Sequence, residues 1–158
     1  MIVTLSGVTG TGKSFFKNTI SEELCFKNLV IVTTREKRIG EVNGIDKEFV
    51  SEEEFEKLKK EKQIVVDFGF LGSKYAYRKA DLDSNVNQVT EVHYSTIYEL
   101  KKNAKNVFSI YMIPKDLERA KQELRKRNLS KETEQKRLKE IDEHIKEYEQ
   151  NKDLQKQF

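Results

Sequence analysis

The chain has 158 residues, and its 30 basic and 27 acidic residues give a formal net charge of +3. This length suits one compact unit with a core of its own. The single cysteine, Cys25, excludes an intrachain disulfide and a four-cysteine metal site, and it favours a cytoplasmic protein. Because charges of both signs are interleaved along most of the sequence, no nucleic-acid partner is expected.

The sequence opens with a β-prone apolar run, residues 2–6, which ends at Gly7. The run is too short for a signal peptide or a membrane span, so no membrane partner is expected. After Lys13, apolar side chains recur at helical spacing, and a second β-prone run follows at residues 29–34. That distance lets the helix cross over and return the chain parallel to the first strand. We therefore predict a strand, helix and strand of a parallel sheet.

Two stretches after residue 50 predict a helix and a small antiparallel piece. Ser51 to Glu54 has the capping-box pattern, which favours a helix from about residue 52 to 62. Residues 64–68 and 74–77 are β-prone and are separated by glycines, as two antiparallel strands would be. We expect these stretches to form an inserted subdomain.

The second half of the chain returns to an alternation of strands and helices. Residues 86–92 form a weaker strand pattern, and residues 106–113 form a stronger one that ends at the only proline. A helix is expected between them, at residues 94–103. From Lys115 onward, two amphipathic helices are predicted around a polar break at residues 127–130. No repeat or low-complexity linker divides the chain, so one folding unit is expected.

The strongest motif lies between the first strand and the first helix. It fits the pattern G-x-x-x-x-G-K-S of a phosphate-binding loop. Its glycines let backbone amides turn inward around phosphate oxygens, and the helix adds its positive end. Lys13 is expected to reach the β and γ phosphates as a catalytic residue, and the Ser14 hydroxyl is expected to bind Mg²⁺. The sequence therefore predicts a site for the phosphates of a nucleotide, with Mg²⁺ as cofactor, formed by Gly7, Thr9, Gly10, Thr11, Gly12, Lys13 and Ser14.

A second motif bears on what receives the phosphoryl group, because a phosphate loop alone does not separate kinases from GTPases or motor ATPases. Arg35 and Arg38 lie three residues apart at the end of a predicted strand. Two guanidinium groups there could bind a phosphate in a bidentate manner. Ordinary surface charge is the alternative for such a pair.

The run from Thr33 to Ser51 resembles the signature of the guanylate kinase family, T-T-R-x-x-R-x-G-E-x-x-G-x-D-Y-x-F-V-S, and looser similarities continue to about residue 140. The resemblance implies an α/β fold, in which a P-loop NTPase core with a parallel sheet flanked by helices carries a small insertion and a lid. The expected parts are a core at residues 1–33 and 81–124, an insertion that binds the nucleoside monophosphate at 34–80, a lid at about 125–136 and a C-terminal helix at 131–150.

The resemblance also implies roles for the arginines. Arg35 and Arg38 would hold the phosphate of the acceptor. Arg127 and Arg137 would be catalytic arginines on the lid side that meet the transferring phosphoryl group, and Arg125 would assist at the ATP site. Phosphoryl transfer depends mostly on positioning, charge neutralisation and exclusion of water, so this arrangement is chemically sensible. An ordinary solvated helical face is the alternative for the stretch from Arg125 to Arg137.

Several positions depart from the family signature where it touches the acceptor. Lys47 and Lys74 replace tyrosines, and a lysine binds an oxyanion but offers no ring to a purine. By the same comparison, Ile31 stands at the position of a guanine-reading serine and Val66 at that of a glutamate, with Asp67 one place further on. For Asp67 and for Glu91, which best matches an aspartate of the family, surface charge is the alternative. The expected acceptor-binding set is Arg35, Arg38, Lys47, Asp67, Lys74, Tyr75 and Glu91.

Three functions follow from this resemblance. The first is ATP-dependent phosphorylation of a nucleoside monophosphate, most simply GMP or dGMP. The second is a P-loop kinase with a changed acceptor, and the third is a binding module of the same fold without catalysis. Only small-molecule nucleotides are expected as partners, for a monomer or a homodimer. His93 and His144 show no spacing for metal or nucleophile chemistry and are expected to be surface or structural residues.

Overall fold

The structure is a computed structural model that describes residues 1–70, 72–126 and 129–158. Its core is a sheet of four parallel strands in the order β2-β7-β1-β8. The strands are β1 (Ile2–Gly7), β2 (Lys27–Asn28), β7 (Gln88–Glu91) and β8 (Val107–Met112). The central strand β1 is buried from Ile2 to Ser6, and Gly7 lies opposite Met112 of β8. The carboxyl ends of the parallel strands therefore meet where β1 gives way to the phosphate loop.

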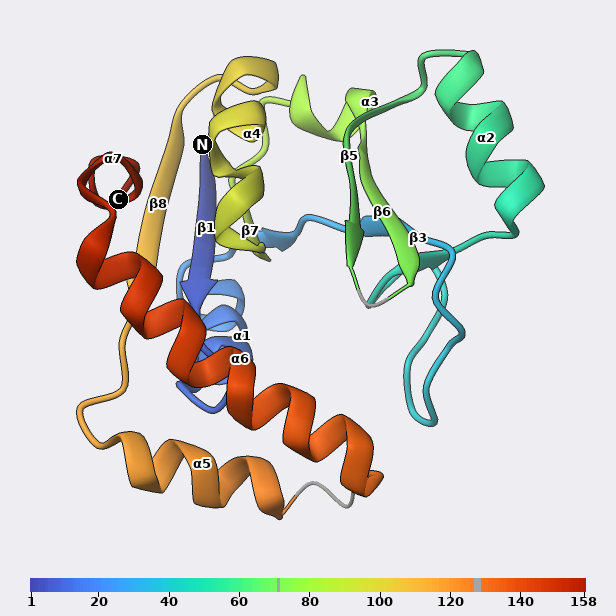
Figure 1. Cartoon of the computed structure of the whole chain (residues 1–158). Helices are drawn as coiled ribbons and strands as arrows, with labels where there is room; N and C mark the ends of the chain where they lie inside the picture. Colours follow the sequence, from blue (N-terminus) through green and yellow to red (C-terminus); the bar gives the residue numbers. More distant parts are fainter. Residues whose placement is uncertain (71, 127–128) are drawn as a thin grey trace.

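Helices cover both faces of this sheet (Figure 1). Val3 and Leu5 point to one face, where they form a cluster with Phe26 and with Ile20 of α1 (Lys13–Glu23). Ile2 points to the other face because side chains alternate along a strand, and it packs in the cluster that contains the buried residues of α4 (Ile97–Asn103). A 3₁₀ turn, η1 (Tyr94–Thr96), precedes α4.

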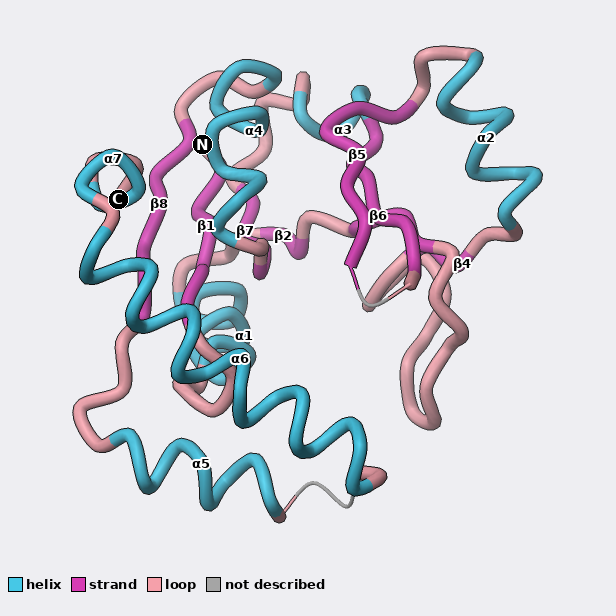
Figure 2. The backbone as a smooth tube through the Cα atoms, viewed as in Figure 1, coloured by secondary structure: helices cyan, strands magenta, loops and turns pink. Residues whose placement is uncertain are grey.

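A second sheet forms the inserted subdomain and lies beside the core sheet (Figures 1 and 2). Its strand order is β4-β3-β6-β5, and β6 runs antiparallel to both of its neighbours. The elements are β3 (Ile31–Thr33), β4 (Glu48–Phe49), α2 (Glu52–Lys60), β5 (Ile64–Phe70), β6 (Ser73–Arg78) and the short α3 (Lys79–Leu82). Ser51 accepts a hydrogen bond from the Glu54 amide at the start of α2, as the capping pattern predicts. Phe55 and Leu58 of α2 are buried against the sheet.

One predicted strand is wrong in its extent and in its partner. The run at residues 29–34 was expected to form one strand parallel to β1, but Ile31–Thr33 pairs antiparallel with β6 in the insertion. Only Lys27–Asn28 joins the core sheet, next to β7. The apolar run serves two cores: Leu29 packs beside Ile2 of β1, whereas Val32 packs beside Phe55 of α2. The second sheet thus begins within the segment 1–33 that was expected to belong to the core.

The C-terminal part consists of α5 (Leu117–Arg125), α6 (Lys131–Gln150) and the short α7 (Lys152–Gln155). Leu124 of α5 and Ile141 of α6 form a buried cluster with Val8 of the phosphate loop. Both helices therefore pack against the phosphate loop, and the prediction of two amphipathic helices is confirmed. Within the described parts of the chain, no helix is long and apolar enough to cross a bilayer.

Candidate functional site

The phosphate loop has a backbone shape that only glycine adopts without strain. Gly7, Gly10 and Gly12 have φ angles of 124°, 90° and 84°. At Gly7 a Cβ atom would lie 2.2 Å from the Met112 oxygen, and at Gly10 it would lie 2.7 Å from the Ala120 oxygen. The close approach of β8 and α5 therefore fixes two of the three glycines.

Lys13 folds back over the loop that precedes it. Its Nζ atom donates hydrogen bonds to the carbonyl oxygens of Gly7 at 2.9 Å and Val8 at 2.7 Å. The Thr11 hydroxyl donates to the same Val8 oxygen at 2.9 Å, which closes the turn. The ammonium is thereby held at the mouth of the loop, beside the amides that a phosphate would meet.

A cavity of about 880 Å³ adjoins the loop on the side of α5. Its lining includes Gly10, Thr11 and Gly12 of the loop, and residues 114–120 and Glu123 of the segment that follows β8. A volume of this size is within the range of small-molecule sites. The cavity places room for a nucleoside directly beside the loop.

Arg35 lies at the end of β3, where two threonines fix the backbone. The Thr33 hydroxyl accepts from the Arg35 amide at 3.1 Å and donates to the Lys74 oxygen at 2.9 Å, and the Thr34 hydroxyl accepts from the Lys74 amide at 3.0 Å. The Arg35 guanidinium donates to both carboxylate oxygens of Glu41, at 2.7 and 2.9 Å, and lies over the ring of Phe49. The predicted phosphate-binding arginine is therefore held in one orientation.

Glu41 also accepts a hydrogen bond from the backbone amide of Arg38 at 2.8 Å. Burial by itself would raise the pKa of Glu41, but the hydrogen bonds from Arg35 and Arg38 outweigh it and hold the pKa below its usual value. Glu41 is thus an anion that links both predicted arginines, although the side chain of Arg38 is exposed. The sequence analysis assigned no role to Glu41. The one sequence feature that pointed to it was the Gly-Glu pair of the family signature, in which Glu41 is the glutamate.

Lys47 lies between the insertion and the core. Burial lowers the pKa of Lys47, the positive charges of Arg35 and Lys17 lower it further, and Glu91 and Glu41 oppose the shift. Lys17 is on α1, one helical turn beyond Lys13, and Glu91 is the last residue of β7. Two other predicted acceptor residues, Arg35 and Glu91, therefore lie close enough to Lys47 for their charges to act on it, as does Lys17, which the sequence analysis did not assign.

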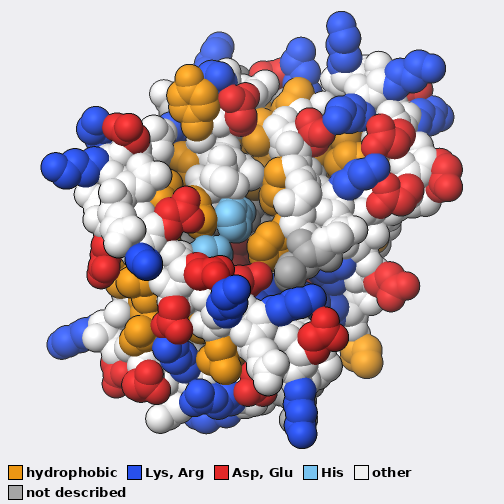
Figure 3. Space-filling view, viewed as in Figure 1, with side chains coloured by type: hydrophobic (Ala, Val, Ile, Leu, Met, Phe, Trp, Pro, Cys, Tyr) orange, Lys and Arg blue, Asp and Glu red, His pale blue; other side chains and the backbone are white. Residues whose placement is uncertain are grey.

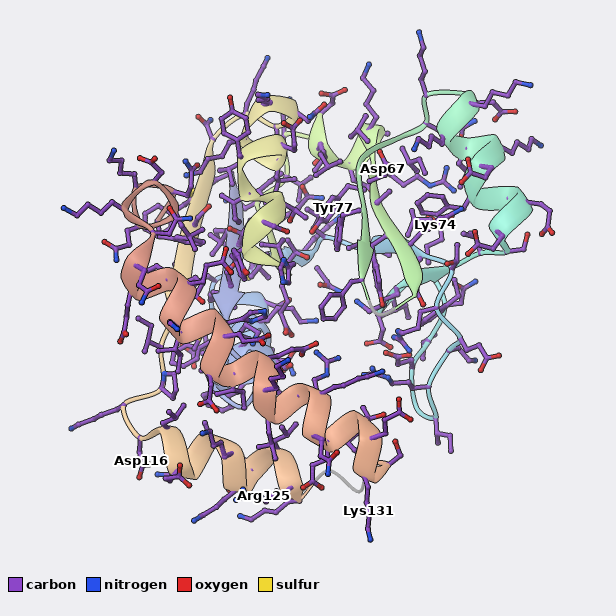
Figure 4. The ribbon with its side chains drawn as sticks, viewed as in Figure 1. Asp67, Lys74, Tyr77, Asp116, Arg125 and Lys131 are labelled. Atoms are coloured by element: carbon purple, nitrogen blue, oxygen red, sulfur yellow. The ribbon has the colours of Figure 1, made fainter. Side chains whose placement is uncertain are left out.

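Three other predicted acceptor residues have partners elsewhere. Asp67 forms an ion pair with Lys59 of α2, and Lys74 forms ion pairs with Glu52 and Glu56 of α2, so both charges are directed toward that helix (Figure 4). The ring of Tyr75 is buried and stacks on Phe68, with the ring centroids 5.3 Å apart. No contact among the described residues joins these three side chains to Arg35.

The segment around Val66 is irregular. Val66 has a φ angle of 55°, and the register of β5 against β6 shifts between Val65 and Phe68. A positive φ is strained for a β-branched residue and marks a bulge. The bulge sets the direction of Asp67, which sequence spacing alone could not predict.

The predicted lid arginines have different surroundings. Arg137 of α6 forms an ion pair with Glu140 at 3.0 Å, and its guanidinium lies over the ring of Phe70 of the insertion, 5.2 Å from the centroid. Arg125, the last residue of α5, is exposed and lies on the outer side of the molecule (Figure 4). Arg127 lies outside the described residues.

The two histidines lie together in a hollow between the core, the insertion and α6 (Figure 3). Their ring centroids are 5.3 Å apart, and His93 also contacts the rings of Phe70 and Tyr94. Burial and the nearby His144 lower the pKa of His93 to about 4, and burial also lowers the pKa of His144. The charge of Lys13 in the phosphate loop also contributes to the lowered pKa of His144. Because the two histidines are 51 residues apart in the sequence (144 − 93), no motif predicted that they would be neighbours.

The residues near the phosphate loop could bind Mg²⁺ only together with a nucleotide, whose phosphates would supply further oxygen ligands. In the described part of the chain, no group of three or more His, Cys, Asp or Glu residues could hold a metal ion. Mg²⁺ prefers hard oxygen ligands and is often held by substrate phosphates with few protein ligands. The exposed Ser14 follows Lys13 at the start of α1 and offers one such oxygen.

Comparisons with known proteins agree with this arrangement. The family profile described as guanylate kinase matches residues 1–156. The guanylate kinase of Rickettsia prowazekii is 31% identical over 132 residues, which cover 80% of this chain and 67% of that protein. The guanylate kinase of Streptococcus pneumoniae strain R6 is 31% identical over 124 residues, which cover 75% of this chain and 60% of that protein.

A solved structure extends the likeness over nearly the whole chain. The crystal structure of guanylate kinase from Anaplasma phagocytophilum superposes with a TM-score of 0.63 at 26% identity, covering 99% of this chain and 79% of that one. The predicted fold class is confirmed by this match. With the profile match over residues 1–156, it establishes that the chain belongs to the guanylate kinase family of nucleoside-monophosphate kinases.

Proposed function

We propose that this chain transfers the γ-phosphoryl group of Mg·ATP to GMP or dGMP. One observation carries the proposal: Lys47, beside Arg35 of the insertion, lies within electrostatic range of Lys17, one helical turn beyond Lys13 of the phosphate loop. Positive side chains that could bind the phosphate of the acceptor thus lie near the loop that would bind the phosphates of ATP. Two anions that repel each other in water are drawn together there by fixed positive charge, as phosphoryl transfer requires.

On the donor side, the phosphate-loop amides and the start of α1 bind the β and γ phosphates. Lys13 exchanges its hydrogen bonds to the Gly7 and Val8 oxygens for hydrogen bonds to the γ-phosphate. The nucleoside of ATP occupies the cavity between the loop and α5. The Ser14 hydroxyl would hold Mg²⁺ together with phosphate oxygens, and the ion would supply positive charge to those phosphates.

On the acceptor side, Arg35 and Lys47 hold the phosphate of GMP, and Arg38 joins them when the insertion closes. Glu41 keeps the Arg35 guanidinium aimed at that phosphate. Glu91 offsets part of the positive charge around Lys47. Asp67, Lys74 and Tyr75 support this seat from the insertion rather than by direct contact.

Closure excludes water and completes the cationic site around the transferring group. Arg137 of α6 already reaches across to Phe70 of the insertion, and this contact supports a role for Arg137 on the lid side, with Arg127 and Arg125 as further candidates. We divide the chain into a core, an insertion at about residues 34–80 and a lid at about residues 125–136. We place the protein in the cytoplasm, as a monomer or homodimer with small nucleotides as its partners.

A panel assay tests the proposal. Purified protein with Mg·ATP and each common ribo- and deoxynucleoside monophosphate should release ADP fastest with GMP or dGMP. Faster ADP release with another monophosphate would show that the acceptor is that nucleotide and not GMP or dGMP. The buried Ile31 and the ion pair of Asp67 with α2 favour this outcome. Binding of ATP without ADP release for any acceptor would refute the kinase proposal.

A further inference from the structure

The hollow that holds the two histidines bears on how the acceptor base is chosen, and the inference drawn from it rests on the proposed function. His93 lies just beyond β7, which pairs directly with β1, the strand that ends in the phosphate loop. In open parallel sheets, ligands bind outside the carboxyl ends of the strands. His93 therefore lies at the ligand-binding edge of the core sheet.

Three elements contribute rings around His93. Phe70 comes from β5 of the insertion, with ring centroids 5.5 Å apart, and His144 comes from α6, at 5.3 Å. Tyr94 of η1 lies at 4.4 Å, and its hydroxyl donates a hydrogen bond to Glu147 of α6. Figure 3 shows atoms of both histidines at the surface within the hollow, and both residues are half-buried. Aromatic rings thus surround His93, and such rings favour stacking with a purine.

The hydrogen bonds of His93 fix which ring nitrogen carries the proton. Nδ1 lies 2.7 Å from the Ser95 hydroxyl oxygen and 3.4 Å from the Ser95 amide nitrogen. A backbone amide can only donate, so the contact with the Ser95 amide makes Nδ1 an acceptor, and its one lone pair is shared between that amide and the Ser95 hydroxyl. In a neutral imidazole the other nitrogen then carries the hydrogen. Among the described residues, both hydrogen bonds of the ring are made at Nδ1, so Nε2–H remains for a ligand.

We infer that His93 is the base-selecting residue of this kinase: its Nε2–H donates a hydrogen bond to a ring carbonyl oxygen of the acceptor base, O6 of guanine. Ser95 is a positioning residue that holds the ring in the required tautomer. With this assignment the site has a hydrogen-bond donor for the acceptor base. The positions considered from the sequence do not supply one, because Ile31 is apolar and Asp67 is ion-paired with α2.

The chemistry of the bases makes this donor selective. Guanine presents the acceptors O6 and N7 on one edge, whereas adenine presents a donor, the N6 amino group, in place of O6. A fixed N–H opposite the adenine amino group would leave both donors unpaired, which costs more than the loss of one hydrogen bond. His93 therefore favours GMP and IMP, which share O6, over AMP and over 2-aminopurine riboside monophosphate, which lack it.

The tautomer can be tested without any ligand. Two-bond ¹⁵N–¹H correlation spectra of the free protein at pH 7 should show His93 as the Nε2–H tautomer. In Ser95→Ala the signals of His93 should shift toward a mixture of tautomers, and in the control Ser84→Ala they should not change. A wild-type ring protonated at Nδ1 would overturn the inference.

Kinetics with matched acceptors test the selection itself. In His93→Leu, kcat/KM for GMP and for IMP should each fall about tenfold or more, whereas kcat/KM for 2-aminopurine riboside monophosphate should change little. His93→Gln, whose amide still donates, should recover part of the preference for GMP. Equal losses for every acceptor, or no loss for GMP, would overturn the inference and leave His93 a packing residue.

Failure of the proposed function would look different. If no monophosphate supports ADP release from the wild-type protein, the kinase proposal fails, and His93 is then tested by calorimetric binding of GMP against 2-aminopurine riboside monophosphate. A tighter binding of GMP that His93→Leu abolishes would support the inference on its own. Equal binding of the two nucleotides by the wild-type protein would overturn it.

Discussion

The phosphate loop and the histidine hollow lie side by side, but they are built in different ways. The loop is a contiguous segment whose shape follows from three glycines and from the register of β1 against β8. The hollow takes one ring each from β5, the end of β7 and α6, residues that are far apart in the sequence. Backbone geometry thus serves the phosphates, which every nucleotide shares, and side chains serve the base, which differs between nucleotides.

The largest effect expected from this comparison is the loss of Lys13. Lys13→Ala should lower kcat by about 10²–10³-fold, because a preorganised charge at the transferring group contributes on that scale. The melting temperature should change little, since Lys13 is a half-buried residue at the rim of the core and its hydrogen bonds to the Gly7 and Val8 oxygens lie within one loop. Coupled ADP release measures kcat, and the exposed Lys105→Ala is the control. Unchanged activity in Lys13→Ala would contradict the donor site.

The second prediction separates two costs of replacing a loop glycine by alanine, the steric overlap of the added Cβ atom and the strain of the backbone at a positive φ angle. Gly7→Ala should lower the free energy of unfolding by about 3 kcal/mol or more, because the added Cβ atom meets the backbone of β8. Gly12 also has a positive φ angle, 84° against 124° at Gly7, but open space around it, so the loss in Gly12→Ala should be about 1 kcal/mol. Urea denaturation followed by circular dichroism measures both values. Equal losses would show that the contact with Met112 is unimportant.

A smaller effect is expected at the acceptor seat. Arg35→Lys should raise KM for the acceptor about tenfold, because an ammonium cannot reproduce the guanidinium fork, and KM for ATP should stay the same. Arg78→Lys is the matched control, since Arg78 also binds both oxygens of one carboxylate, that of Glu48. Initial-rate kinetics give both constants. A rise in KM for ATP alone would move Arg35 to the donor side.

The smallest effect concerns acid stability and belongs to the hollow. Burial and His144 lower the pKa of His93 to about 4, below its ordinary value of about 6.5. Between these values the unfolded chain binds a proton that the folded chain does not, so stability falls as the pH is lowered through this window. Glu147 opposes the shift of His93, and Glu140, Glu143 and Glu147 oppose that of His144, to which Lys13 adds.

Thermal melts at pH 7 and pH 5 test this dependence. The melting temperature should be about 2–4 °C lower at pH 5, and the difference should shrink in His93→Gln. His144→Gln should reduce it as well, because the pKa of that ring is also lowered. The same pH difference in all three proteins would mean that other groups carry the acid sensitivity.

The sequence was sufficient for the local parts of the fold. The capping pattern at Ser51 predicted α2, and periodicity predicted α5 and α6, because hydrogen bonds and side chains within a few residues set these features. The partner of a strand is not local. Ile31–Thr33 pairs with β6, more than 40 residues away, and the sequence alone favoured β1 instead.

The same division holds for the site. The sequence by itself determined the phosphate loop, and it marked Arg35, Lys47 and Glu91 individually, because each lies within a contiguous motif or at the end of one strand. The tertiary structure decided that the charges of Arg35, Glu91 and Lys17 act on Lys47, that Asp67 and Lys74 are directed toward α2, and that His93 and His144 share one hollow. The physical reason is that a bulge in β5 and the packing of α6 against the insertion set these directions, and both depend on contacts between segments distant in the chain.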